Sequence, residues 1–78
     1  MNIPKPLAAA EVGQTVRVVS LTAEGRMRRR LADLGLIPGA VVECLGRSPL
    51  GDPTAYLIRG AVIAIRRRDA MEVLVTTE

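Results

Sequence analysis

The feature that most constrains this chain is the close spacing of its turn signals. Glycine and proline interrupt the apolar stretches, and the longest uninterrupted apolar runs, such as Ala61–Ile65, are far too short to cross a bilayer. Short runs bounded by glycine or proline are typical of brief strands. A chain of 78 residues also buries only about 60% of its unfolded surface, so its core is thin. We therefore expect a single domain over residues 1–78, built mostly of short strands.

One segment has helical rather than strand spacing. Within residues 24–35, the apolar side chains of Met27, Leu31 and Leu34 fall at positions i, i+4 and i+7, which form one stripe of a helix. Gly35 follows the last of them, at the position where a left-handed glycine often ends a helix. The spacing therefore predicts one short helix in this segment.

Alternating apolar residues and regular turn signals predict five strands. Val16 and Val18 alternate with polar neighbours in the first strand, and Pro38-Gly39, a pair that suits a type II turn, precedes the second. The predicted strands are Thr15–Leu21, Val41–Gly46, Thr54–Arg59, Ala61–Arg66 and Val73–Thr77. Since no βαβ repeat is present, we predict a mainly β fold: a small SH3-like β-barrel of five strands with one short α-helix between strands 1 and 2.

Two connecting segments carry weaker signals. Pro4 and Pro6 exclude a helix through residues 1–10, which we expect to form a strap, with one short turn over Leu7–Glu11. Arg67–Met71 is expected to make one helical turn before the last strand.

The residue types that build metal or catalytic sites are scarce. The chain has no histidine, one cysteine and no carboxylates at ligand spacing, so we expect no iron, zinc or calcium site and no cofactor. Without histidine the hydroxyl side chains lack an activating base, and no glycine-rich phosphate loop occurs, so we expect no enzyme activity. Cys44 alternates with Val42 and is expected to point inward. The lone cysteine and the absence of a signal peptide in residues 1–10 favour the cytoplasm.

A set of short motifs, in order along the chain, resembles a known family. The motifs are Gly13-Gln14, Arg28–Gly39, Pro49–Pro53, Arg59-Gly60, Ile63–Arg66 and Asp69-Ala70. Each is common alone, but together they cover nearly the whole chain and resemble the ferrous iron transport protein A family (FeoA), small SH3-like proteins of the bacterial cytoplasm. The resemblance implies an accessory protein that regulates ferrous iron transport by binding the cytoplasmic part of the FeoB transporter. It would be peripheral to the membrane through that partner only.

The third and fourth predicted strands, Thr54–Arg59 and Ala61–Arg66, are expected to form a hairpin with an apolar outer face. The side chains expected to face inward are Tyr56, Ile58, Ile63 and Ile65. The period of two then sends Leu57, Val62 and Ala64 outward, and a turn at Gly60-Ala61 would place Leu57 opposite Ala64. Scattered exposed apolar residues are ordinary, but a contiguous patch is typical of a binding surface. We predict that these three residues, with Leu50 in the neighbouring loop, bind the partner.

A run of arginines on the predicted helix is the second candidate surface. Such a run is usually a solvated face, and Arg29 can pair with Asp33 at i+4. The functional interpretation is a basic face that docks on acidic protein surface. Its members would be Arg28, Arg29 and Arg66, extended by Arg26 and Arg67.

Other functions compete with transporter binding. All but Lys5 of the 11 basic residues are arginines, which could contact nucleic-acid phosphates, and residues 13–18 resemble the opening of small barrels of translation proteins. The net charge is only +3, however, and the single aromatic residue, Tyr56, is expected to be buried, so we expect no nucleic-acid partner. Because the fold also occurs in iron-dependent repressors, a stand-alone repressor-type module is a further alternative. Homo-oligomerisation through the hairpin is another alternative that the sequence leaves open.

Overall fold

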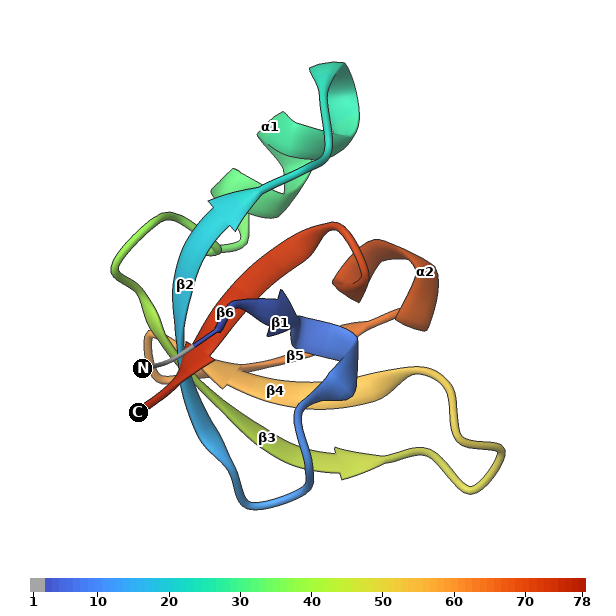
Figure 1. Cartoon of the computed structure of the whole chain (residues 1–78). Coiled ribbons are helices and arrows are strands. Elements are labelled where there is room, and N and C mark those ends of the chain that lie inside the picture. Colours follow the sequence, from blue (N-terminus) through green and yellow to red (C-terminus); the bar gives the residue numbers. More distant parts are fainter. Residues whose placement is uncertain (1–2) are drawn as a thin grey trace.

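The computed structural model describes residues 3–78, which form a single curved antiparallel sheet with helices at its margins (Figure 1). The sheet has six strands in the order β1-β6-β2-β3-β4-β5. The elements are β1 Lys5–Pro6, the 3₁₀ turn η1 Leu7–Ala9, β2 Thr15–Leu21, α1 Gly25–Asp33, β3 Val41–Arg47, β4 Thr54–Ile58, β5 Ala61–Ile65, α2 Arg67–Ala70 and β6 Val73–Thr77. The five predicted strands, the predicted helix and the two shorter turns expected after Pro6 and Arg66 are therefore present, with ends that shift by a few residues at most.

The prediction of five strands is wrong by one, because part of the N-terminal strap joins the sheet. Lys5 pairs with Val75 and Pro6 with Leu74, which makes β1 an edge strand beside β6. A proline is tolerated there because the edge has no further strand that needs its missing N–H. The strap prediction began at residue 1, and residues 1–2 lie outside the described part of the chain.

The prediction of a closed barrel is also wrong. Among the described residues, β1 and β5 are the two edges of the sheet, and no pairing joins them. Two residues, one of them Pro6, offer too few hydrogen-bonding groups for β1 to close the sheet against β5. The sheet stays open at β5, which leaves the outer edge of that strand without a strand neighbour.

The core is aliphatic, as the composition requires. Alternate residues of the strands point into the curved sheet, and they include Val16, Val18, Val42, Ile58, Val73 and Val75. Tyr56 and Cys44 are buried with them, so both predictions of an inward side chain are confirmed. Burial raises the pKa of the Cys44 thiol, an effect that outweighs the opposite influence of Arg47. Cys44 therefore acts as a small core residue in its neutral form.

Helix α1 projects from the end of β2 and touches the rest of the molecule mainly through its last turn (Figure 1). Leu31 is its one buried side chain among the described residues, and Met27 packs only partly on the core. The helix ends at Gly35, which has φ 103° and closes a Schellman motif through the Leu36 N–H, which donates to the Leu31 carbonyl. A β-carbon at Gly35 would lie 2.9 Å from Cγ2 of Ile58, so this glycine sets how closely the helix approaches β4.

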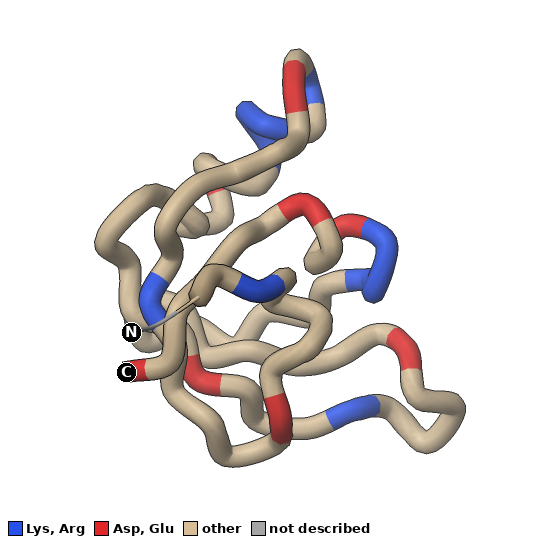
Figure 2. The backbone as a smooth tube through the Cα atoms, viewed as in Figure 1, with Lys and Arg blue, Asp and Glu red and all other residues tan. Residues whose placement is uncertain are grey.

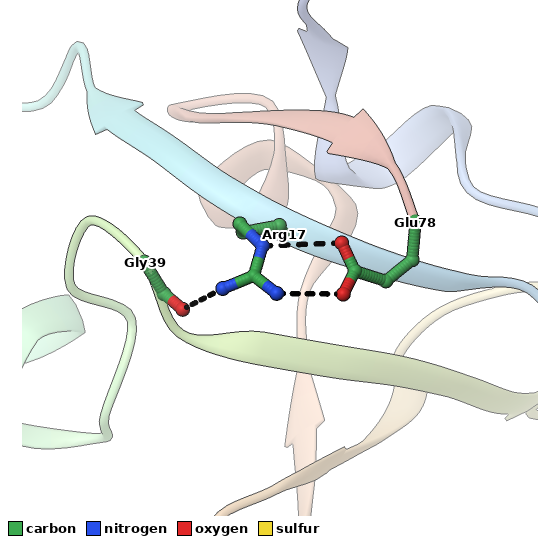
Figure 3. A network of polar contacts seen from close by, with 3 residues as sticks. All are labelled: Arg17, Gly39 and Glu78. Atoms are coloured by element: carbon green, nitrogen blue, oxygen red, sulfur yellow. Dashed lines mark hydrogen bonds and ion pairs between the residues drawn. The ribbon is translucent and has the colours of Figure 1, made fainter.

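The C-terminal end is fastened to the strand and turn beside it. The Arg17 guanidinium donates to both carboxylate oxygens of Glu78, at 2.7 and 3.1 Å, and to the Gly39 carbonyl at 3.0 Å (Figure 3). Glu78 raises the pKa of Arg17 through the hydrogen bond first and the charge second. Gly39 has φ 92°, and the Ala40 N–H donates to Ile37, which confirms the predicted type II turn.

Candidate functional site

The β4–β5 hairpin turns one residue earlier than predicted. Ile58 pairs with Ala61, so the two-residue turn is Arg59-Gly60, with φ values of 52° and 79°. Two positive φ values are the geometry that a tight hairpin prefers, because they match the right-handed strand twist. The hairpin itself is confirmed, but its predicted register is wrong.

The corrected register changes which side chains face each other. Leu57 lies opposite Val62, and Ala64 lies opposite Ala55. Val62 is 67% exposed and Ala64 is exposed as well, while Leu57 is half-buried. The inward alternation also holds only in part, since Ile63 is half-buried at the edge of the sheet. The outer face of the hairpin is apolar, and Val62 and Ala64 are its exposed members.

A shallow apolar groove runs across this outer face from β3 to β5. A bulge in β3, where the register shifts between Cys44 and Gly46, adds Leu45 to the outward surface. The groove is lined by Leu45, Gly46, Arg47, Ser48, Pro53, Ala55, Val62 and Ala64. We call this surface the apolar groove. The Ser48 Oγ at its end is buried without a hydrogen-bond partner in the described structure.

Two of the residues nominated for the apolar surface lie outside the groove. Leu50 is 95% exposed at the tip of the loop between β3 and β4, and the lining includes Pro53 of that loop instead. Leu57 lies between Glu43 and Val62 on the same sheet but does not line the groove. The structure therefore brings Val62 and Ala64 together and leaves Leu50 apart.

Figure 2 shows basic positions, in blue, on α1 and on the segment that follows β5. The side chains of the three consecutive arginines of α1 have different surroundings. The Arg28 Nη1 donates to the Leu21 carbonyl at 3.0 Å, which ties the helix to the end of β2. Within residues 3–78, the side chain of Arg29 has neither a hydrogen bond nor an ion pair, and the anticipated pair with Asp33 is not formed. Arg30 lines a cleft, so the three side chains do not share one set of contacts.

That cleft lies between the last turns of α1 and the segment that leaves β5. It is lined by Arg30, Leu31, Leu34, Pro53, Ala64, Ile65, Arg66, Arg68 and Asp69, and it has a volume of about 220 Å³. We call it the arginine cleft. The only acid in its lining, Asp69, lies 3.8 Å from Nε of Arg68. Within the described structure, the guanidinium groups of Arg30 and Arg66 have no partner, so the cleft keeps uncompensated positive charge.

The apolar groove and the arginine cleft adjoin each other. Pro53 and Ala64 line both, so the two form one continuous surface along the open side of the sheet. Of the nominated residues, Val62, Ala64 and Arg66 belong to this surface. Sequence reasoning missed Arg30, Arg68, Leu45 and Ala55; of these, Ala55 alone was signalled, since it shares the period of Leu57 along β4.

Residues 3–78 lack two features of other functional classes. No three residues among histidine, cysteine, aspartate and glutamate gather there in a way that could hold a metal ion. None of the helices in that range has the length and apolar character needed to span a membrane.

Comparison with known proteins places the chain among proteins of iron transport. The family model described as FeoA domain matches residues 5–77. A fusion protein of Fe(2+) transport protein A and Fe(2+) transporter FeoB from Porphyromonas gingivalis is 28% identical over 67 residues, which are 86% of this chain and only 8% of that protein.

Solved structures give the same grouping. A FeoA-like protein of Clostridium acetobutylicum superposes with a TM-score of 0.90 at 30% identity, covering 99% of this chain and 90% of the other. The zinc-complexed FeoA of Stenotrophomonas maltophilia, described as a prokaryotic SH3 domain protein, gives a TM-score of 0.79 at 26% identity and covers 90% and 87%. The fold is thus SH3-like, with an open sheet.

Proposed function

Because this chain belongs to the FeoA family, whose members accompany ferrous iron transport, we propose that it regulates a FeoB-type transporter by binding the transporter's cytoplasmic part. The observation that carries the proposal is the fusion relative, in which a matching segment is joined to a FeoB transporter within one polypeptide. Covalent joining holds two modules at high effective concentration, which benefits modules that work against each other. A separate chain must obtain the same proximity from a binding surface.

The apolar groove supplies such a surface. Val62 and Leu45 expose apolar side chains on a rigid sheet. The small side chains of Ala55 and Ala64, which lie opposite each other, line the same hollow. A hollow with apolar walls on a pre-formed scaffold loses little conformational entropy when a partner side chain fills it. Of the residues predicted to bind the partner, Val62 and Ala64 line this groove, and we propose that they lie at the centre of the binding surface.

Binding of this kind can regulate transport only through a difference between transporter states. If the chain binds one state about 1.4 kcal/mol more tightly than another, it shifts their ratio about tenfold. The regulatory protein then needs no chemistry of its own, which agrees with its scarcity of catalytic and metal-binding side chains.

A co-purification experiment with the co-expressed transporter tests this proposal. We expect the wild-type chain to be retained and Val62→Glu to be lost, because binding would remove the new carboxylate from water on an apolar face. Val12→Glu is the matched control, since Val12 is 55% exposed and lies outside the groove. Leu57→Glu is a less selective variant because Leu57 is half-buried. Retention of Val62→Glu at the wild-type level would remove the groove from the proposal.

Transporter activity provides the second measurement. GTP turnover and iron uptake by the transporter should change when the wild-type chain is added and stay at the basal level with Val62→Glu. If neither rate responds to the wild-type chain although binding occurs, the chain is an interaction partner without the regulatory effect.

A further inference from the structure

The arginine cleft contains charge that the rest of the molecule does not use. The guanidinium groups of Arg30 and Arg66 have no partner within residues 3–78, and the single acid of the lining, Asp69, is shared with Arg68. The same lining includes the apolar side chains of Leu31, Leu34 and Ile65. Guanidinium groups beside apolar walls are suited to carboxylates and phosphates, which they bind with paired hydrogen bonds.

The size of the cleft selects among anionic ligands. Its volume of about 220 Å³ falls below the range of about 300–1,000 Å³ that sites for cofactors and drug-sized ligands usually occupy. One or two side chains fit such a space, whereas a nucleotide does not. A carboxylate on a short apolar stem, such as a glutamate or aspartate side chain, matches both the charge and the volume.

The neighbouring edge of β5 adds a third feature. In a two-residue hairpin the turn-closing pair, here Ile58 and Ala61, is hydrogen-bonded, and the pairs then alternate along the ladder. The residues between the bonded pairs, Val62 and Ala64, thus direct their N–H and C=O groups away from β4. Within the described chain these groups have no backbone partner. The strand has neither proline nor lysine, the usual devices that protect an edge.

We propose that the arginine cleft and the open edge of β5 together bind an extended acidic segment of a partner protein. The segment adds to β5 as a further strand, with its backbone bonded to Val62 and Ala64. One acidic side chain enters the arginine cleft between Arg30 and Arg66, and apolar side chains of the same segment lie on the apolar groove. Ala64 lines both hollows, so a single strand along this edge reaches them together.

A second copy of the chain is a poorer occupant than an acidic segment. The β5 strand, Ala61–Ile65, contains no acidic residue, and it is flanked by Arg59 on one side and Arg66 on the other. Antiparallel pairing of two copies would bring Arg59 of one toward Arg66 of the other, which is unfavourable. Charge complementarity therefore favours a partner that carries aspartate or glutamate. The inference rests on the proposed function because it describes how a transporter or its associated protein would be held.

The first experiment uses random peptides displayed on phage against the immobilised full chain. We expect the selected peptides to combine aspartate or glutamate with apolar residues in an extended stretch. Peptides without acidic residues, or no selection at all, would overturn the proposal. In a ¹⁵N-labelled sample, the selected peptide should shift the amide signals of residues 62–66 and of Arg30 more than those elsewhere, and shifts confined to other surfaces would contradict it.

Two double variants separate a built cleft from net charge alone. Arg30→Ala/Arg66→Ala removes both unpartnered guanidinium groups and should weaken binding of the selected peptide about tenfold or more. Arg26→Ala/Arg29→Ala removes the same charge from exposed positions outside the cleft and should change the affinity less than about twofold. Equal losses in the two variants would show attraction by net charge and overturn the cleft. Light scattering should show a monomer, and a dimer through β5 would overturn the choice of occupant.

The outcomes are distinguishable from failure of the proposed function. Peptide binding without any association with the transporter would leave the cleft standing and remove the transporter as partner. Conversely, transporter binding that survives Arg30→Ala/Arg66→Ala, together with no selection of acidic peptides, would leave the function standing and remove this inference.

Discussion

The β4–β5 hairpin and helix α1 border the same surface but are held in the molecule in different ways. The hairpin is fixed by a continuous ladder to β3, and its inner side chains Tyr56, Ile58 and Ile65 are fully packed. The helix is anchored by Leu31 at its last turn, while its first turns project from the body. A pattern of alternating side chains thus yields a rigid apolar face, whereas the helix places each arginine in a separate environment.

The difference also separates affinity from orientation. The apolar groove is suited to binding through buried area, which salt affects little, because the hydrophobic effect does not depend on charge. The arginine cleft adds electrostatic attraction and direction, which salt weakens. A ligand that touches both would be held by the groove and oriented by the cleft.

The largest expected effect is on stability, when the close approach of α1 to β4 at Gly35 is disturbed. Gly35→Ala should lower the free energy of unfolding by about 3 kcal/mol, because a side chain at positive φ is strained and its β-carbon would collide with Ile58. Urea denaturation measures the change. Gly25→Ala is the control: it also has positive φ but meets nothing within 4 Å, so it should cost only about 1 kcal/mol. Equal costs would show that the close approach to β4 is unimportant.

A second prediction sharpens the electrostatic contrast between the regions. Raising the ionic strength from 0.05 to 0.5 M, concentrations chosen to shorten the screening length, should weaken the binding of an acidic peptide to the wild-type chain about tenfold. The Arg30→Ala/Arg66→Ala variant should show only a small fraction of that salt dependence. Fluorescence anisotropy titrations give the dissociation constants. A variant with the full wild-type dependence would assign the attraction to other arginines.

A third, smaller effect tests how the start of α1 is held. Arg28→Ala removes the hydrogen bond to the Leu21 carbonyl and should destabilise the chain by about 1 kcal/mol. Amide hydrogen exchange in the first turns of α1 should quicken more than in β4 and β5. Arg29→Ala, which removes a neighbouring arginine without a described partner, should be nearly neutral. If both variants behave alike, the Arg28 contact does not support the helix.

The smallest effect is expected at the far end of the apolar groove. The Ser48 Oγ is buried without a described hydrogen-bond partner, so Ser48→Ala should leave stability within about 0.5 kcal/mol of the wild type or raise it slightly. Thermal denaturation followed by circular dichroism is sufficient. A clear loss of stability would mean that the hydroxyl is bonded, for example through an ordered water.

Much of the fold followed from local patterns, and the exceptions have physical causes. The alternation of Val16 and Val18 and the Pro38-Gly39 turn predict elements that the structure contains. By contrast, β1 contains Pro6 and has no alternation, so only its pairing with β6 reveals it. The hairpin register depends on one residue of turn position, and Arg59 gave no signal for its left-handed conformation.

The candidate site was predicted less well for a similar reason. Val62 and Ala64 followed from the period of two, which needs only their own strand. Arg30 and Arg68 could not be distinguished from their arginine neighbours, because their role depends on how α1 and α2 lie beside the end of β5. The outward position of Leu45 depends on the bulge in β3, for which the sequence contains no turn signal.

By itself, the sequence determined an aliphatic, mainly β chain with one short helix, because period and turn chemistry act between residues that are near neighbours. It also determined that the chain has no histidine and a single cysteine, which is a matter of composition. Tertiary structure alone decided that the sheet stays open at β5 and that an apolar groove adjoins an arginine cleft at Pro53 and Ala64. Those outcomes depend on long-range pairing and packing, where small shifts in register or helix position change which side chains meet.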